Sequence, residues 1–301
     1  MFTDAEFVSE GVMLRGRLYR NEGSRGPQPA VVMTHGFSAT ITMVADRFAE
    51  VFAEAGFVVL LYDHVGFGIS DGEPRQVINP WAQARGYRDA LSYLRMVNGV
   101  DPGRMAVWGD SLSGGEALVV AAVDERVAAV VIQVPVCGPR EAPEDRDGAL
   151  FAALRRTLLD GDITGSGGTS VGPLAVVSVD QLGTPSLLTP ITAFRWFIEY
   201  GGRHGTGWEN VATLVTPDTP APLHPGLCSQ HLRIPSLWML APTDEMPVAN
   251  PDVARRVYES ASGDKQLFEI DGGHFGLLHW PSELFELAAT VQRDFLKQVF
   301  N

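Results

Sequence analysis

A serine in a setting of small residues is the first candidate for chemistry in this chain. Residues 104–108 form a mostly apolar run, and the turn-like stretch Gly-Asp-Ser-Leu-Ser follows directly, with its serines at Ser111 and Ser113. A serine on a sharp strand-to-helix turn stands clear of the backbone, and its neighbours must be small because strand and helix pass close together. This stretch therefore predicts Ser111 as a nucleophile. Ser113 lies deeper in the expected helix, where a hydroxyl tends to bond a backbone carbonyl, and is the weaker alternative.

An acid and a histidine follow two later expected strands. Asp244 comes after residues 235–241, and His274 comes after residues 266–270. The carboxyl ends of parallel strands lie at one edge of a sheet, where ligands bind. The order serine, acid, histidine, each beyond a strand, predicts a triad of Ser111, Asp244 and His274. Three residues farther from the strand ends are weaker alternatives: Glu245, Asp252 and His279.

These residue types suit acyl chemistry. A serine hydroxyl is a weak nucleophile near neutral pH until a base takes its proton, and histidine titrates in the right range. An acid holds the imidazole in the required tautomer and stabilises the imidazolium. The tetrahedral intermediate carries a negative oxygen, which backbone N–H groups stabilise by roughly 3 kcal/mol each. We expect these donors to be the N–H of Leu112, just after the nucleophile, and that of Phe37, in a His-Gly-Phe stretch after an earlier strand.

Apolar runs suited to buried strands alternate with helical patterns along most of the chain. Residues 5–20 predict an antiparallel hairpin with its turn near residues 10–11. The further expected strands are 29–34, 57–62, 105–108, 127–134, 235–241 and 266–270, and the expected helices are 41–54, 81–97, 112–123, 252–260 and 282–299. Strands that are apolar on both faces and alternate with helices predict an α/β fold, with a mostly parallel central sheet covered by helices on both faces.

The alternation stops between residues 139 and 231. This segment holds helical pieces at 150–159 and 190–200, a Gly/Ser-rich loop at 161–172 and a proline-dense loop at 216–225. We expect an inserted, largely helical cap at 139–231 above a core domain formed by residues 1–138 and 232–301.

Four residues are candidates for a substrate pocket. Phe194, Trp196 and Phe197 give the second helical piece of the cap an aromatic stripe, although cap helices also bury aromatic residues simply to fold. His64 follows the strand expected at 57–62, where it either lines the pocket or makes a structural hydrogen bond.

Composition excludes several classes of protein. The 301 residues carry a formal net charge of −13, which argues against nucleic acid or an anionic membrane as a partner. The acidic N-terminal residues and the lack of a long apolar run predict neither a signal peptide nor a membrane span, so we expect a cytoplasmic protein.

Two distant cysteines and the absence of ligand spacing predict no disulfide framework and no metal site. No cofactor is expected, because Gly66-x-Gly68 does not open a helix as a dinucleotide-binding loop does. A homodimer is an alternative to a monomer.

Together these motifs resemble the serine hydrolases of the α/β-hydrolase superfamily. The pieces that carry the resemblance cover nearly the whole chain: residues 35–37, 63–75, 109–115, Asp244 and 273–275. Residues 70–81 and the Ser-x-Ser-Gly-Gly turn are also similar to a subgroup near the X-Pro dipeptidyl-peptidase/acetyl esterase-like hydrolases. That subgroup includes esterases and acyltransferases of polyketide and other secondary-metabolite pathways.

The resemblance implies the α/β-hydrolase fold and an enzyme of the carboxylesterase or thioesterase type. We expect it to cleave an ester or thioester of a small-to-medium apolar acyl substrate through an acyl-enzyme on Ser111. An acyltransferase, or a hydrolase of lactones or carbon–carbon bonds, with the same triad is the first alternative. An aminopeptidase and a non-catalytic ligand receptor are less favoured alternatives.

Overall fold

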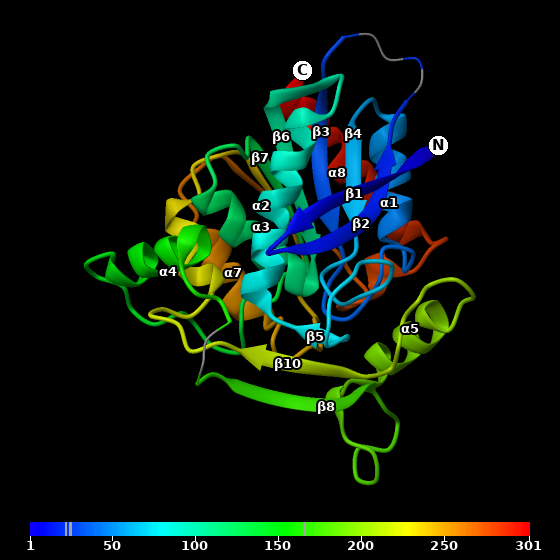
Figure 1. Cartoon of the computed structure of the whole chain (residues 1–301), viewed down its shortest axis with the longest axis vertical. Helices are drawn as coiled ribbons and strands as arrows, with labels where there is room; N and C mark the ends of the chain where they lie inside the picture. Colours follow the sequence, from blue (N-terminus) through cyan, green and yellow to red (C-terminus); the bar gives the residue numbers. More distant parts are fainter. Residues whose placement is uncertain (22, 24–25, 165–166) are drawn as a thin grey trace.

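An eight-stranded sheet forms the centre of the computed structural model, which describes residues 1–21, 23, 26–164 and 167–301 (Figure 1). Its strand order is β1-β2-β4-β3-β6-β7-β11-β12. The bounds are β1 Phe2–Ser9, β2 Val12–Tyr19, β3 Gln28–Thr34, β4 Val58–Tyr62, β6 Val100–Asp110, β7 Ala129–Gln133, β11 Ser236–Leu240 and β12 Lys265–Glu269. In this order, each pair of neighbours from β4 through β3, β6, β7 and β11 to β12 is parallel. Strand β2 pairs antiparallel with both β1 and β4. The predicted, mostly parallel sheet is therefore confirmed.

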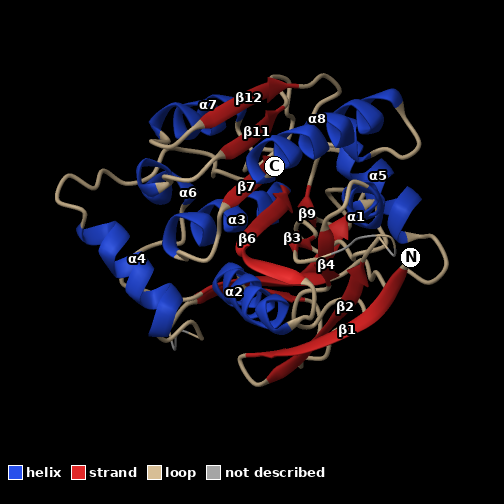
Figure 2. Ribbon diagram, turned by 90° about the horizontal axis from the view of Figure 1, so that it is seen from above, coloured by secondary structure: helices blue, strands red, loops and turns tan. Residues whose placement is uncertain are grey.

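Helices cover both faces of this sheet (Figure 2). On one face lie α1 (Ala45–Glu54) and α8 (Glu283–Phe300), and on the other lie α2 (Pro80–Met96), α3 (Ser111–Val123) and α7 (Pro251–Ser260). Strands β4, β7 and β11 are buried along their whole length, which explains their apolar composition. Edge strand β1 instead alternates exposed and buried residues toward its end. Each face of the sheet thus has its own hydrophobic core.

Helix starts follow local capping chemistry. The Asn79 side chain accepts hydrogen bonds from the first backbone N–H groups of α2, and Asn250 does the same for α7. Ser282 caps α8 by accepting from the N–H of Phe285. These caps place the observed starts within two residues of the expected ones. The largest difference among the core elements is β6, which extends over Val100–Asp110 rather than the expected 105–108.

Residues 139–231, called the insertion below after their expected role, are more mixed than the largely helical cap that the sequence indicated. The insertion contains α4 (Ala149–Asp160), α5 (Ile191–Gly201), the short α6 (Pro225–Cys228) and a 3₁₀ turn at Ser229–His231. It also contributes three strands to a second sheet of order β5-β10-β8-β9, which lies at the bottom of Figure 1. The insertion supplies β8 Thr169–Val177, β9 Ser186–Leu188 and β10 Ala212–Thr216, and the fourth strand, β5 Val77–Ile78, comes from the core segment.

The second sheet was not predicted, because its strands pair across long stretches of sequence. Strand β8 pairs antiparallel with β10, so that Thr169 faces Thr216. The loop expected at 161–172 is therefore corrected at its end, where residues 169–172 belong to β8; residues 165–166 lie outside the described residues. Across the described ranges, no helix combines the length and the apolar character needed to cross a membrane.

Candidate active site

The turn between β6 and α3 holds Ser111 in a strained conformation. Strand β6 ends at Asp110 and α3 begins at Ser111, whose φ of 55° lies in the left-handed region. A Cβ on Gly109 would collide with the Ser113 carbonyl oxygen, so the strand and the helix pass as closely as the sequence predicted. Such a turn lifts the serine side chain off the end of the sheet.

The Ser113 side chain points into the protein interior. It is fully buried, its hydroxyl donates to the backbone carbonyl of His35, and the His64 Nε2 lies 3.2 Å from its Oγ. The hydroxyl thus ties α3 to the loop after β3. The structure therefore separates the two serines, with Ser111 facing a pocket and Ser113 inside the protein.

Ser111, His274 and Asp244 form one continuous hydrogen-bonded chain. The Ser111 Oγ lies 2.9 Å from the His274 Nε2, and the His274 Nδ1 lies 2.7 Å from an Asp244 carboxylate oxygen. Asp244 follows β11 and His274 follows β12, so neighbouring parallel strands deliver both groups to the same edge. The side chains of His274 and Asp244 are only 2% and 3% exposed, respectively, which keeps bulk water away from their hydrogen bond.

The alternative acids and the alternative base occupy other positions. The Glu245 carboxylate accepts the backbone N–H of His274 at 2.9 Å rather than reaching its ring. Asp252 is exposed in the first turn of α7. The ring of His279 packs 5.8 Å from that of Tyr200.

The loop after β3 packs directly against the serine turn. A Cβ on Gly36 would lie 2.8 Å from the Ser111 Cβ, so this close approach requires glycine. Asp63 steadies the loop, because its carboxylate accepts the N–H of Ile41 at 2.9 Å and lies 3.2 Å from the His35 Nε2. Phe37 follows Gly36 with a φ of 38° and lines the same pocket as Ser111.

Leu112 is the second residue of α3. The first N–H groups of an α-helix have no intrahelical acceptor, so the Leu112 N–H is free for another acceptor next to Ser111. Leu112 directly follows Ser111 and Phe37 lines the same pocket, so their N–H groups stay the predicted oxyanion donors.

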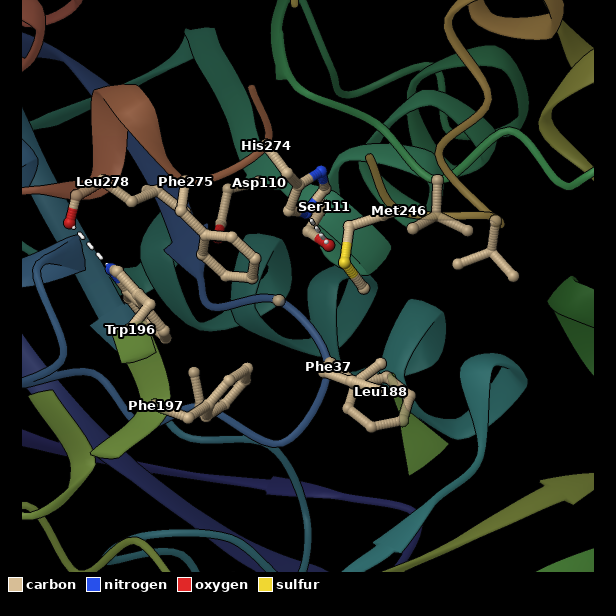
Figure 3. Close-up of a pocket in the computed structure, with 14 residues that line it drawn as sticks. Phe37, Asp110, Ser111, Leu188, Trp196, Phe197, Met246, His274, Phe275 and Leu278 are labelled. Atoms are coloured by element: carbon tan, nitrogen blue, oxygen red, sulfur yellow. Dashed lines mark hydrogen bonds between the residues drawn. The ribbon is translucent and has the colours of Figure 1, made fainter. Parts of the chain in front are cut away.

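An apolar pocket opens over Ser111 (Figure 3). Its polar lining comes from Asp110, Ser111 and His274, at the edge of the core sheet. The rest is apolar and comes from both parts of the chain: Gly36, Phe37, Ala39, Val136, Leu188, Trp196, Phe197, Met246, Val248, Phe275 and Leu278. Figure 3 shows Trp196 and Phe197 on one side of this space and His274 with Ser111 on the other.

Two of the four expected pocket residues lie elsewhere. Trp196 and Phe197 line the pocket, as does Leu188 of β9, which the sequence did not single out. Phe194 is a correction, because it lies beside the buried stripe of α5 formed by Ala193, Trp196, Phe197 and Tyr200 and does not line the described pocket.

His64 is the second correction, since it does not line the described pocket either. It is 1% exposed and lies behind the serine turn, with its Nε2 3.8 Å from the Glu116 carboxylate. Burial lowers the pKa of His64 well below its ordinary value and raises that of Glu116 well above its own. Burial thus favours the neutral form of each group, and the structural hydrogen bond to Ser113 is the role that the structure gives His64.

Asp110 is a pocket residue that the sequence did not single out. It lines the pocket and is only 7% exposed, and this burial raises the pKa of its carboxyl to about 6. The signal in the sequence was its place at the end of a buried strand, immediately before the nucleophile. Within the described part of the chain, no group of three or more His, Cys, Asp or Glu side chains is arranged to hold a metal ion.

The chain is similar in sequence to proteins of known families. Residues 25–162 match the family model described as "Serine aminopeptidase, S33". The chain is 36% identical over 316 residues to "Polyketide transferase grgF" of Penicillium sp, covering 98% of this chain and 96% of that protein. It is 40% identical over 136 residues to "Thiohydrolase aneE" of Aspergillus aculeatus, a match that covers 45% of this chain and 42% of the relative.

A solved structure extends the likeness to three dimensions. The crystal structure of "Alpha/beta hydrolase GrgF" from Penicillium sp. sh18 superposes with a TM-score of 0.74 at 25% identity, covering 100% of this chain and 99% of that one. Full-length similarity in sequence and fold, with Ser111, Asp244 and His274 at the ends of three parallel strands, shows that this chain belongs to the α/β-hydrolase superfamily.

Proposed function

We propose that this protein is a serine hydrolase that cleaves an ester or thioester of a small-to-medium apolar acyl group. The observation that carries the proposal is the hydrogen-bonded chain from Asp244 through His274 to Ser111, which ends at the floor of an apolar pocket. The names of two relatives, a thiohydrolase and a polyketide transferase, support acyl chemistry of this kind.

In the first half-reaction, the Ser111 Oγ attacks the acyl carbonyl while the His274 Nε2 takes its proton. Asp244 holds the other ring nitrogen and stabilises the imidazolium that forms. The carbonyl oxygen becomes an oxyanion and accepts the N–H groups of Phe37 and Leu112. Collapse of this intermediate breaks the bond to the alcohol or thiol, which leaves with the proton from His274.

In the second half-reaction, His274 deprotonates a water molecule that attacks the acyl-enzyme. A second tetrahedral intermediate forms, and its collapse returns the proton to Ser111 and releases the carboxylic acid. The reaction consumes one water and needs no other reactant.

The apolar lining favours an uncharged acyl chain. Trp196, Phe197 and Phe275 offer aromatic surface, and Asp110 is the one carboxyl outside the triad among the described pocket residues. A charged acyl tail would lose its hydration here without gaining an opposite charge. A substrate amine, as in an aminopeptidase reaction, would meet a single acid rather than a pair.

Acyl transfer is the second candidate function. The relative with 36% identity is named a polyketide transferase, and an apolar enclosure that excludes water favours another nucleophile in the second half-reaction. Hydrolysis and transfer share the acyl-enzyme and differ only in what removes the acyl group.

The test combines a variant with a covalent probe. Ser111→Ala should lower kcat on the best ester or thioester of a graded acyl series by about 10⁶-fold, and a phosphonate probe should label the parent at Ser111 but not the variant. Ser262→Ala removes an exposed hydroxyl far from the pocket and is the matched control, with turnover and labelling expected as in the parent. Unchanged turnover in Ser111→Ala would overturn the proposal. Adding an alcohol or amine to the assay and analysing the products separates transfer from hydrolysis.

A further inference from the structure

The cap helix α5 is bonded to the segment that carries His274. Trp196 donates its Nε1–H to the Leu278 carbonyl at 2.9 Å, a contact drawn in Figure 3. The Tyr200 hydroxyl accepts the backbone N–H of Trp280 at 2.8 Å. These two side chains are four residues apart and therefore share one face of the helix.

A third contact on the same face runs through Glu245. Thr192, four residues before Trp196, donates its hydroxyl to one oxygen of the Glu245 carboxylate. The other oxygen of that carboxylate accepts the backbone N–H of His274 at 2.9 Å. A single side chain therefore joins the start of α5 to the main chain of the histidine.

The surrounding residues are suited to this contact. A Cβ on Gly273 would collide with the Glu245 carboxylate, so the glycine before His274 leaves the space that the carboxylate fills. Helix α5 begins after Pro190, which gives it no side-chain cap, and a carboxylate beside its first turn is favourable for the helix dipole. Glu245 also directly follows Asp244, whose carboxylate bonds the imidazole of the same histidine.

We propose that Glu245 is a positioning residue that sets His274 and the pocket wall together. This inference rests on the proposed function. One end of the carboxylate holds the His274 main chain, while Asp244 orients the ring. The other end holds α5, which presents Trp196 and Phe197 to the acyl group. An acyl chain that displaces α5 therefore also displaces the base, so that pocket fit affects kcat as well as KM.

The test uses three variants of this contact. Glu245→Ala removes both hydrogen bonds and should lower kcat by about 10²-fold, because a misplaced base costs that much even when it is chemically intact. Glu245→Gln should recover most of the loss, since its carbonyl can accept the His274 N–H and its amide can donate to the Thr192 hydroxyl. Thr192→Val releases only the cap end and should cause a smaller loss, seen mainly as a higher KM.

Asp252→Asn is the matched control, because it also removes a carboxylate from the first turn of a helix but lies exposed on α7. It should leave kcat and KM unchanged. Thermal unfolding of each variant identifies any that fail to fold. A folded Glu245→Ala variant with the kcat of the parent would overturn the inference, as would a Glu245→Gln variant as slow as Glu245→Ala. Failure of the phosphonate probe to label Ser111 in the parent would instead overturn the proposed function.

Discussion

The edge of the core sheet and the inserted segment contribute differently to the same pocket. The core supplies every polar group of the described lining, including Ser111 and His274, and apolar surface as well. The insertion supplies only apolar side chains, namely Leu188, Trp196 and Phe197. Under the proposed function, this division implies that the core determines which bond is broken, whereas the insertion selects the acyl group.

The largest effect is expected when the polar side chains that the core supplies to the site are replaced. His274→Ala should lower kcat by about 10⁶-fold, since the base and the nucleophile act as one unit. Asp244→Asn keeps the shape of the site but should cost about 10⁴-fold, because it favours the wrong imidazole tautomer. Steady-state kinetics on one ester measures both. Equal losses in the two variants would contradict the separate roles given to base and acid.

A smaller effect is expected from the loop beside the serine turn. Gly36→Ala places a Cβ 2.8 Å from both the Ser111 Cβ and the Asp110 carbonyl oxygen, so the loop must move away. Displacing the Phe37 N–H should lower kcat by about 10²- to 10³-fold, the usual loss for one oxyanion donor. KM should change little, which separates this effect from a change in the pocket. Gly11→Ala is the control for added bulk at a glycine, since its Cβ would meet no atom within 4 Å, although its φ of +78° adds backbone strain.

The sequence predicted the core more fully than the insertion for a physical reason. Strands such as β4, β7 and β11 are continuous apolar runs, and Asp244 and His274 each lie a few residues beyond the end of an expected strand. The parallel sheet then brings residues that are 163 positions apart, Ser111 and His274, within hydrogen-bond distance. Local patterns therefore sufficed once the fold class was recognised.

No comparable local pattern indicates how the elements of the insertion pack. Strand β8 is exposed over residues 169–173, and its partner β10 comes only after β9 and α5 in the sequence, so local patterns do not indicate this pairing. Phe194, Trp196 and Phe197 looked equivalent in the sequence, and only the packing of α5 separates the two that reach the pocket. His64 and Asp110 both lie at strand ends, and the sequence does not indicate that only the Asp110 side chain turns into the described pocket.

The next prediction concerns stability and tests whether the apolar pocket disfavours the charged form of the Asp110 carboxyl, which the core supplies. Its pKa is about 6 in the folded protein against 3.8 for an ordinary aspartate, because burial disfavours the carboxylate. A raised pKa contributes stability that is fully present below pH 3.8 and is lost as the pH rises through 6. Asp110→Asn lacks this dependence, so its free energy of unfolding should rise relative to the parent by about 3 kcal/mol between pH 3.5 and pH 7. Urea unfolding of both proteins at several pH values measures the difference, and a constant difference would show that burial does not disfavour this carboxylate.

The smallest expected effect distinguishes two aromatic residues of the insertion. Phe197→Leu enlarges the pocket beside Trp196 and should shift the preference toward longer acyl chains by about tenfold in the ratio of kcat/KM values, since one or two methylenes are worth that much. Phe194→Leu is the same substitution three residues earlier on α5, outside the pocket lining, and should leave the ratio unchanged. Both variants should keep kcat on their best substrate, because neither touches the triad. If both shifted the preference equally, the effect would come from a general loosening of α5, and the insertion would not select the acyl group through its lining residues.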